Sequence, residues 1–139
     1  MSQFRFVTPI SVRFGDLDTL GHVNNVPYVR YLEEGRGHYF DEVVGVPFET
    51  IDTVVAELQV EFRSEITRGQ DVEVAVRVPE LGTSSIPMEY EIRATDPDTA
   101  ETTVAATAET VQVNTDRETG EAVPIPDAWR SAIGEFENW

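Results

Sequence analysis

The sequence has 139 residues, which suits one folded domain and is too short for two. Hydrophobic residues make up 40% of it, enough for a core, and the absence of cysteine excludes disulfides, thiolate metal ligands and cysteine nucleophiles. Ten basic residues against 26 acidic ones give a net charge of −16 at pH 7, which disfavours binding to nucleic acid.

The basic residues are all arginine, and the acidic residues are spread along the chain instead of forming one tail. A dispersed acidic surface without lysine is typical of a halophilic protein, because concentrated salt screens the repulsion between like charges. An ordinary acidic protein is the alternative. No apolar stretch is long enough for a transmembrane helix or a signal peptide. We therefore expect a cytoplasmic protein with one domain, residues 1–139, and no membrane association.

Residues 4–14 (FRFVTPISVRF) are rich in aromatic and β-branched side chains, and they predict a strand that is interrupted at Pro9. Glycine, aspartate and asparagine dominate residues 15–25, which predict a loop.

A long helix is predicted after this loop, with Asn24 or Asn25 as its cap, and it runs to about Val43. Gly35 and Gly37 each cost a helix interior roughly 1 kcal/mol relative to alanine, so we expect the helix to press closely onto a sheet. Apolar residues three or four positions apart form one face of it: Tyr28, Tyr31, Leu32, Gly35 and Tyr39.

Later in the chain, apolar and polar residues alternate, as they do in strands with one buried face. In the first of these strands the apolar face consists of Ala56, Leu58, Val60 and Phe62. The predicted strands are 54–62, 71–78, 85–95 and 102–114. A turn at 115–121 and a short helix at 128–136, capped by Asp127, follow. We predict an α+β fold in which a five-stranded antiparallel sheet wraps the long helix, with the last four strands in a meander.

The densest polar cluster is DLDTLGHVNN, residues 16–25, between the first strand and the long helix. It begins like an EF-hand calcium loop, but Leu20 and Pro27 stand where oxygen ligands belong, which strongly disfavours that interpretation. A purely structural role in turns and capping is one alternative. In the other, Asp18 acts on a carbonyl whose oxygen is stabilised by the amides and the dipole of the helix N-terminus.

Other catalytic constellations are missing from the sequence. There is no G-x-S-x-G motif around a serine nucleophile. The two histidines, His22 and His38, do not form H-E-x-x-H, which disfavours a zinc hydrolase. No metal and no redox cofactor is expected.

The segment VRFGDLDTLGHVNNVPY, residues 12–28, closely resembles the hot-dog-fold acyl-CoA thioesterases, in their 4-hydroxybenzoyl-CoA thioesterase branch. The helix segment YLEEGR (31–36) and the tail TGEAVPIP (119–126) are similar as well, so the resemblance covers nearly the whole chain. It implies hydrolysis of an acyl-CoA thioester to a free acid and CoA.

The resemblance also implies roles for single residues. Asp18 corresponds to the catalytic carboxylate, acting as nucleophile or general base, and the backbone N–H of Asn25 polarises the thioester carbonyl. His22 orients the attacking water or Asp18, with a structural role as the alternative. Asp16 is expected to be an acceptor that stabilises the loop. Substrate contacts are expected at Gly21, Asn24, Tyr28, Phe62, Arg63, Ser64, Thr83, Ser84 and Ser85.

The resemblance further implies a homodimer or homotetramer with active sites between protomers, so that Asp18 faces strand residues of the neighbour. Thr83, Ser84 and Ser85 match the place where relatives meet the CoA nucleotide, but that segment carries no basic residue here. Candidate phosphate contacts are then Arg63, Arg68 and Arg93. A non-catalytic module that binds acyl-CoA or an acyl carrier, and a hot-dog hydratase, remain as rivals. The acyl group is not specified by the sequence.

Overall fold

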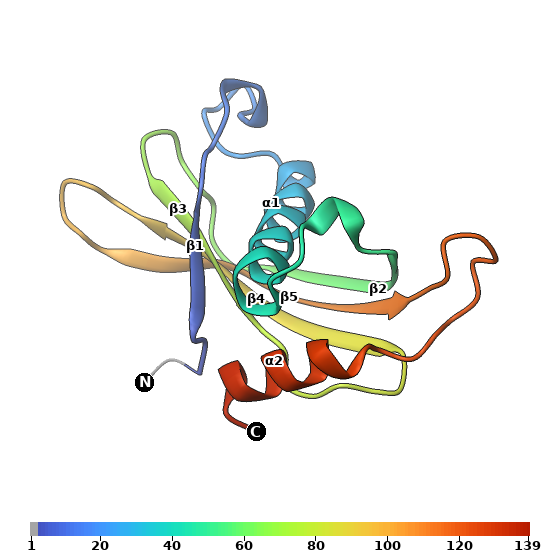
Figure 1. Ribbon diagram of the computed structural model, residues 1–139. Helices are drawn as coiled ribbons and strands as arrows, with labels where there is room; N and C mark the ends of the chain where they lie inside the picture. The colour runs from blue at the N-terminus through green and yellow to red at the C-terminus, as the bar shows by residue number, and fades with distance from the viewer. Residues whose placement is uncertain (1–2) are drawn as a thin grey trace.

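One long helix lies against one face of a five-stranded antiparallel sheet in the computed structural model, which describes residues 3–139 (Figure 1). The predicted α+β architecture is therefore confirmed. The elements in chain order are β1 (Phe6–Ile10), α1 (Asn25–Tyr39), β2 (Thr53–Phe62), β3 (Asp71–Arg77), β4 (Ser85–Thr95), β5 (Thr102–Asn114) and α2 (Asp127–Glu137).

The strand order across the sheet is β1-β3-β4-β5-β2. The predicted four-strand meander is wrong at its first strand, because only β3, β4 and β5 follow one another as neighbours. The chain carries β2 to the far edge, where it pairs with β5, and β1 forms the other edge beside β3. The alternation of apolar and polar residues identifies strands but not which strands pair, because the pairing depends on the connections between them.

β1 continues through Pro9, so the predicted interruption is wrong. Pro9 is exposed and lies opposite Glu73 of β3, and within residues 3–139 no strand pairs with the other side of β1. An edge strand tolerates the missing N–H of proline where that position faces solvent.

The apolar face of α1 is buried as predicted, with Tyr31 and Leu32 almost fully inaccessible. A Cβ built on Gly35 would lie 2.9 Å from Cγ1 of Val74 in β3, which confirms that the helix presses its backbone onto the sheet. The equivalent neighbour of Gly37 is the ring of Phe48, not a strand. A π-helical turn, Phe40–Val44, extends α1 and agrees with the predicted end.

The second helix, α2, also packs against the core. Phe136 packs edge-on against Tyr39 at 5.9 Å, and the Tyr39 hydroxyl donates to Glu137 over 2.7 Å. Asp127 is the first residue of α2, so its predicted place as the cap is wrong; Pro126 holds that position without a side-chain hydrogen bond. Among residues 3–139, neither helix has the length and apolar character that a membrane crossing requires.

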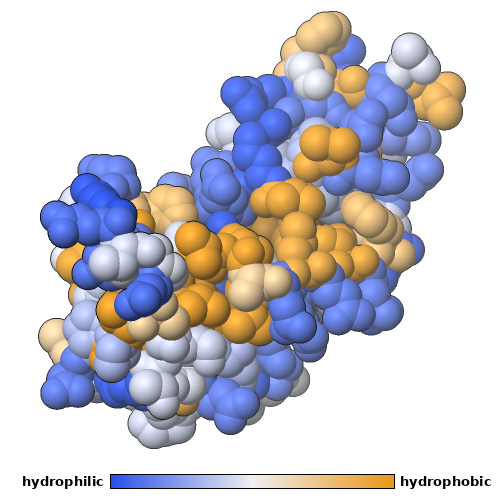
Figure 2. Space-filling view, turned by 90° about the vertical axis from the view of Figure 1, so that its right-hand side faces the viewer, coloured by the Kyte–Doolittle hydropathy of each residue, from blue (hydrophilic) through white to orange (hydrophobic). Residues whose placement is uncertain are grey.

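The edge strand β2 differs from the other strands because both of its faces are largely accessible. A bulge at Ala56 shifts the pairing with β5, which takes Ala56 out of the predicted alternation. Val54, Leu58 and Phe62 are 53%, 46% and 51% exposed. Figure 2, which views the molecule from the side on which β2 lies in Figure 1, shows an apolar patch surrounded by hydrophilic surface.

Candidate active site

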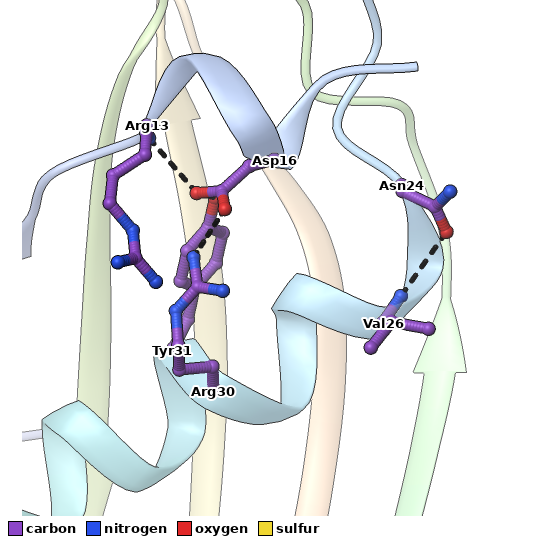
Figure 3. Close-up of polar contacts among 6 residues, drawn as sticks. All are labelled: Arg13, Asp16, Asn24, Val26, Arg30 and Tyr31. Carbon is purple, nitrogen blue, oxygen red and sulfur yellow. Dashed lines mark hydrogen bonds and ion pairs between the residues drawn. The ribbon is translucent and has the colours of Figure 1, made fainter.

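The loop between β1 and α1 is tied to the helix through Asp16, as Figure 3 shows. Asp16 is 2% exposed and accepts from the hydroxyl of Tyr31 at 2.6 Å, from the N–H of Arg13 at 2.9 Å and from Arg30 at 2.5 Å. Its backbone carbonyl accepts from the N–H of Asn24 over 2.8 Å. The expectation that Asp16 stabilises the loop is confirmed.

These contacts also control the charge of Asp16. Burial raises the pKa of its carboxyl, but the hydrogen bonds from Tyr31, Arg13 and Arg30 outweigh burial and lower that pKa overall. The group is therefore an ionised anchor at neutral pH, with both oxygens occupied.

Asp18 lies two residues further on and has different surroundings. Its Oδ1 accepts from the backbone N–H groups of Leu20 at 2.8 Å and of His22 at 3.1 Å, within one tight turn. Gly21 has φ +79 in this turn, a conformation that glycine adopts without strain. No donor in residues 3–139 is bonded to Oδ2 of Asp18. The backbone hydrogen bonds from His22 and Leu20 lower the pKa of Asp18, so a free, ionised oxygen faces outward.

The N-terminus of α1 begins directly after this turn. Asn24 is the cap, and its side chain accepts from the N–H of Val26 over 3.4 Å. Asn25 is the first helical residue, and no acceptor in residues 3–139 takes its backbone N–H. An unsatisfied N–H at a helix N-terminus, aligned with the helix dipole, is suited to stabilising a negatively charged oxygen.

A cleft of about 480 Å³ joins these groups to the end of β2. The ring of Phe62 packs edge-on against Tyr28 at 5.0 Å across it. Tyr28 is 3% exposed, so the residue both packs in the core and borders the cleft. Residues of one chain line this cleft: Asp18, His22, Val23, Asn24, Asn25, Tyr28, Phe62, Arg63, Ser64 and Glu65. Phe62, Arg63 and Ser64 of the same chain therefore lie in the cleft with Asp18.

The side chain of His22 points to Glu65, with Nδ1 at 3.3 Å from Oε2, while its backbone N–H contacts Asp18. The alternating pattern does not predict Glu65 as a site residue, because Glu65 lies after the end of that pattern at Phe62. Within residues 3–139, no group of three histidine, cysteine, aspartate or glutamate side chains could hold a metal ion.

Three predicted contacts lie elsewhere. Thr83, Ser84 and Ser85 are at the start of β4, the end of the sheet away from Asp18. The carbonyl of Thr83 accepts from Arg130 of α2, and that of Ser84 accepts from Asn114. A single protomer does not bring this segment to the cleft.

The candidate phosphate contacts differ in availability. Arg93 is only 17% exposed and pairs with Glu91 at 2.9 Å and Glu73 at 3.7 Å. Arg63 lines the cleft and pairs with Glu61 at 3.1 Å. Arg68 is exposed and makes no ion pair within residues 3–139.

Solved structures with this fold include several thioesterases. A thioesterase from Thermus thermophilus, crystallised with coenzyme A and Zn, is 35% identical, with a TM-score of 0.84, covering 100% of this chain and 98% of that one. A predicted thioesterase from Bacillus stearothermophilus is 29% identical, with a TM-score of 0.81, covering 94% of this chain and 95% of that one. The helix and sheet described above thus form the hot-dog fold of thioesterases.

The family follows from the sequence comparison. The chain belongs to the Thioesterase-like superfamily, whose family model matches residues 12–133. The uncharacterized protein YsmA of Bacillus subtilis (strain 168) is 30% identical over 134 residues, which cover 95% of this chain and 87% of YsmA.

Proposed function

We propose that the protein hydrolyses acyl-CoA thioesters, with Asp18 as the essential carboxylate and the N–H of Asn25 as the group that polarises the carbonyl. The observation that carries the proposal is their presence in one cleft: an ionised carboxylate oxygen without a donor, and a helix N-terminal N–H without an acceptor, among residues 3–139. A thioester carbonyl between them would meet a nucleophile at carbon and a donor at oxygen.

The chemistry has two routes that use the same atoms. In the first, Oδ2 of Asp18 bonds to the carbonyl carbon, the CoA thiolate leaves, and water cleaves the resulting anhydride. In the second, Asp18 takes a proton from a water molecule that attacks the carbon directly. In both routes the carbonyl oxygen becomes negative beside the N–H of Asn25, and a proton ends on the thiolate. In the first route, water attacks Cγ of Asp18, so its oxygen stays on the aspartate and the acid leaves with Oδ2. In the second route, the oxygen of the water ends in the acid.

The environment of Asp18 keeps its carboxylate ionised, which both routes require. General-base catalysis is most effective when the pKa of the base lies near the working pH. The backbone N–H groups of His22 and Leu20 instead lower the pKa of Asp18, which keeps it ionised but weakens it both as a base and as a nucleophile. Single-turnover hydrolysis in ¹⁸O water separates the routes, because only the anhydride route places the label in the side chain of Asp18.

The proposed enzyme is a homodimer, or a pair of such dimers. The support is the free edge of β2, which offers unpaired backbone groups together with exposed Val55 and Leu58. Two β2 edges of two copies would extend the sheet and cover these side chains. Sedimentation velocity measures this directly, and a monomer at assay concentrations would contradict it.

The test of the proposed activity is turnover of aromatic, short branched and medium-length acyl-CoAs in molar KCl. We expect Asp18→Asn to reduce kcat by about 100-fold or more, since positioned bases and nucleophiles contribute at least that much. Asp116→Asn is the matched control, because Oδ1 of Asp116 also accepts two backbone N–H groups in an exposed turn. Equal rates in the wild type and a folded Asp18→Asn variant would refute the assignment, and CoA binding without turnover in the wild type would favour a binding module.

A further inference from the structure

A second hollow, of about 630 Å³, lies on the other side of the loop that carries Asp18. It separates residues 9–17 from the turn between β2 and β3. Leu17 lines this hollow and Asp18 lines the cleft, so consecutive residues of the loop face the two sites. The N–H of Arg68 donates to the carbonyl of Gly21 over 2.9 Å, which fixes the turn against the loop.

The hollow is distinguished by its charge. Arg13 and Arg68 line it with a single carboxylate, Asp71. In four other surface hollows, including the cleft, the lining carboxylates outnumber the arginines. A chain with a net charge of −16 repels an anionic ligand over most of its surface. The hollow lined by Arg13 and Arg68 is therefore the surface hollow best suited to bind an anionic group.

The two arginines are also available. Most arginines of the chain form ion pairs with carboxylates, and Arg130 donates to backbone carbonyls. In residues 3–139, Arg5, Arg13 and Arg68 form no ion pair. Figure 3 shows that Arg13 contacts Asp16 only through its backbone N–H, and no drawn contact involves its guanidinium. Arg13 lines this hollow and also the neighbouring hollow over α1.

An aromatic ring completes the set. Phe14 is 84% exposed and lines the same hollow beside Arg13. Exposure of a whole phenyl ring costs hydrophobic free energy that a stacked ligand would recover. A planar base on the ring and phosphates on two guanidinium groups together describe a nucleotide.

We propose that this hollow binds the adenosine phosphate end of coenzyme A, with Phe14 against the adenine and Arg13 and Arg68 on the phosphates. The assignment rests on the proposed acyl-CoA hydrolysis and places the nucleotide of the substrate beside the same loop that supplies Asp18. It differs from the earlier expectation of Thr83, Ser84 and Ser85, whose segment carries no cation.

The test compares two substrates with the same acyl group, an acyl-CoA and the acyl thioester of pantetheine, which lacks the nucleotide. We expect the double variant Arg13→Ala/Arg68→Ala to raise KM for acyl-CoA about tenfold, one charge-assisted contact or more, with kcat unchanged. Its kcat/KM for the pantetheine thioester should equal that of the wild type. Arg5→Ala/Arg117→Ala, which removes two arginines outside the hollow, is the control and should leave both substrates unaffected.

Binding of adenosine 3′,5′-bisphosphate, measured by calorimetry, needs no catalysis and separates this proposal from the proposed activity. The wild type should bind it, Phe14→Ala more weakly, and the double arginine variant at least tenfold more weakly. If the wild type hydrolyses no acyl-CoA but binds the bisphosphate, and the arginine variants lose this binding, the nucleotide site stands and the proposed activity does not. Three results would overturn the nucleotide site. The double arginine variant could have an unchanged KM for acyl-CoA, or it could lose kcat/KM equally with both substrates. Alternatively, KM could rise only in Thr83→Ala/Ser84→Ala.

Discussion

Two turns of this molecule, one at Asp18 and one at Asp116, have almost the same local chemistry. Oδ1 of Asp18 accepts backbone N–H groups at 2.8 and 3.1 Å, and Oδ1 of Asp116 does so at 2.8 and 3.0 Å. Both carboxylates are exposed, and in both the backbone hydrogen bonds lower the pKa. By itself, this geometry is a common way to close a turn.

The surroundings of the two turns differ. The turn at Asp18 leads directly into the N-terminus of α1 and faces the end of β2, whereas the turn at Asp116 closes on Glu121 and Ala122 after β5. The comparison shows that the turn determines the ionisation of the carboxylate, while the neighbouring helix end and cleft determine what the carboxylate can act upon.

The largest test of this difference removes the helix donor without removing the helix. Asn25→Pro deletes one N–H at the first helical position, where proline is well tolerated and where Asn24, at φ −64 and ψ 158, suits a following proline. We expect kcat to fall by about 100- to 1000-fold, the effect of losing one oxyanion donor. Steady-state kinetics measure it.

Asn25→Ala is the matched control for that variant, because it removes the side chain and keeps the N–H. It should retain most of the activity. If both variants lost activity equally, the side chain of Asn25 and not its backbone would be responsible.

An intermediate effect is expected at Asp16, which separates anchoring from catalysis within the same loop. Asp16→Asn weakens three hydrogen bonds to a buried carboxylate, including the one from Tyr31, and should lower the free energy of unfolding by about 2 kcal/mol. Asp116→Asn, in an exposed turn, should change it by less than about 0.5 kcal/mol. Urea denaturation measures both, and similar values for the two would contradict the anchoring role.

The smallest effect concerns pH. Because the folded pKa values of Asp18 and Asp116 lie below the ordinary 3.8, each carboxylate stabilises the fold above pH 3.8 and loses that contribution as pH falls through the lower folded value. Carboxyl carbon NMR should give midpoints below 3.8 for both. An Asp18 midpoint above 3.8 beside a lowered Asp116 would mean that the cleft, and not the turn, determines its ionisation.

The parts of this structure that could be predicted from the sequence are those coded by neighbouring residues. The order DLDTLGHVNN predicts a loop and a helix capped by Asn24 or Asn25, and the structure has Asn24 as the cap and Asn25 as the first helical residue. The buried face of α1 followed from its spacing. The pairing of β2 with β5 could not be predicted, because a crossover and a bulge decide it.

One buried side chain, that of Arg36, was not predicted to be buried because it is charged. Arg36 is 6% exposed and donates to the hydroxyl of Tyr90 over 3.2 Å in the core. It lies four residues after Leu32, on the buried face, so the helical spacing contained the signal. A guanidinium is ordinarily placed in solvent, since burial is costly without partners, and the partner on β4 is 54 residues away.

The close contact between Gly35 and Val74 limits how near the third turn of α1 can approach the sheet. A methyl group at position 35 would push α1 away from the sheet. Because the helix is rigid, its N-terminus, ten residues earlier and about 15 Å along the axis, would move as well. The N–H of Asn25, the proposed donor to the substrate oxygen, therefore has its height above the sheet set by the contact between Gly35 and Val74, which a residue without a side chain allows.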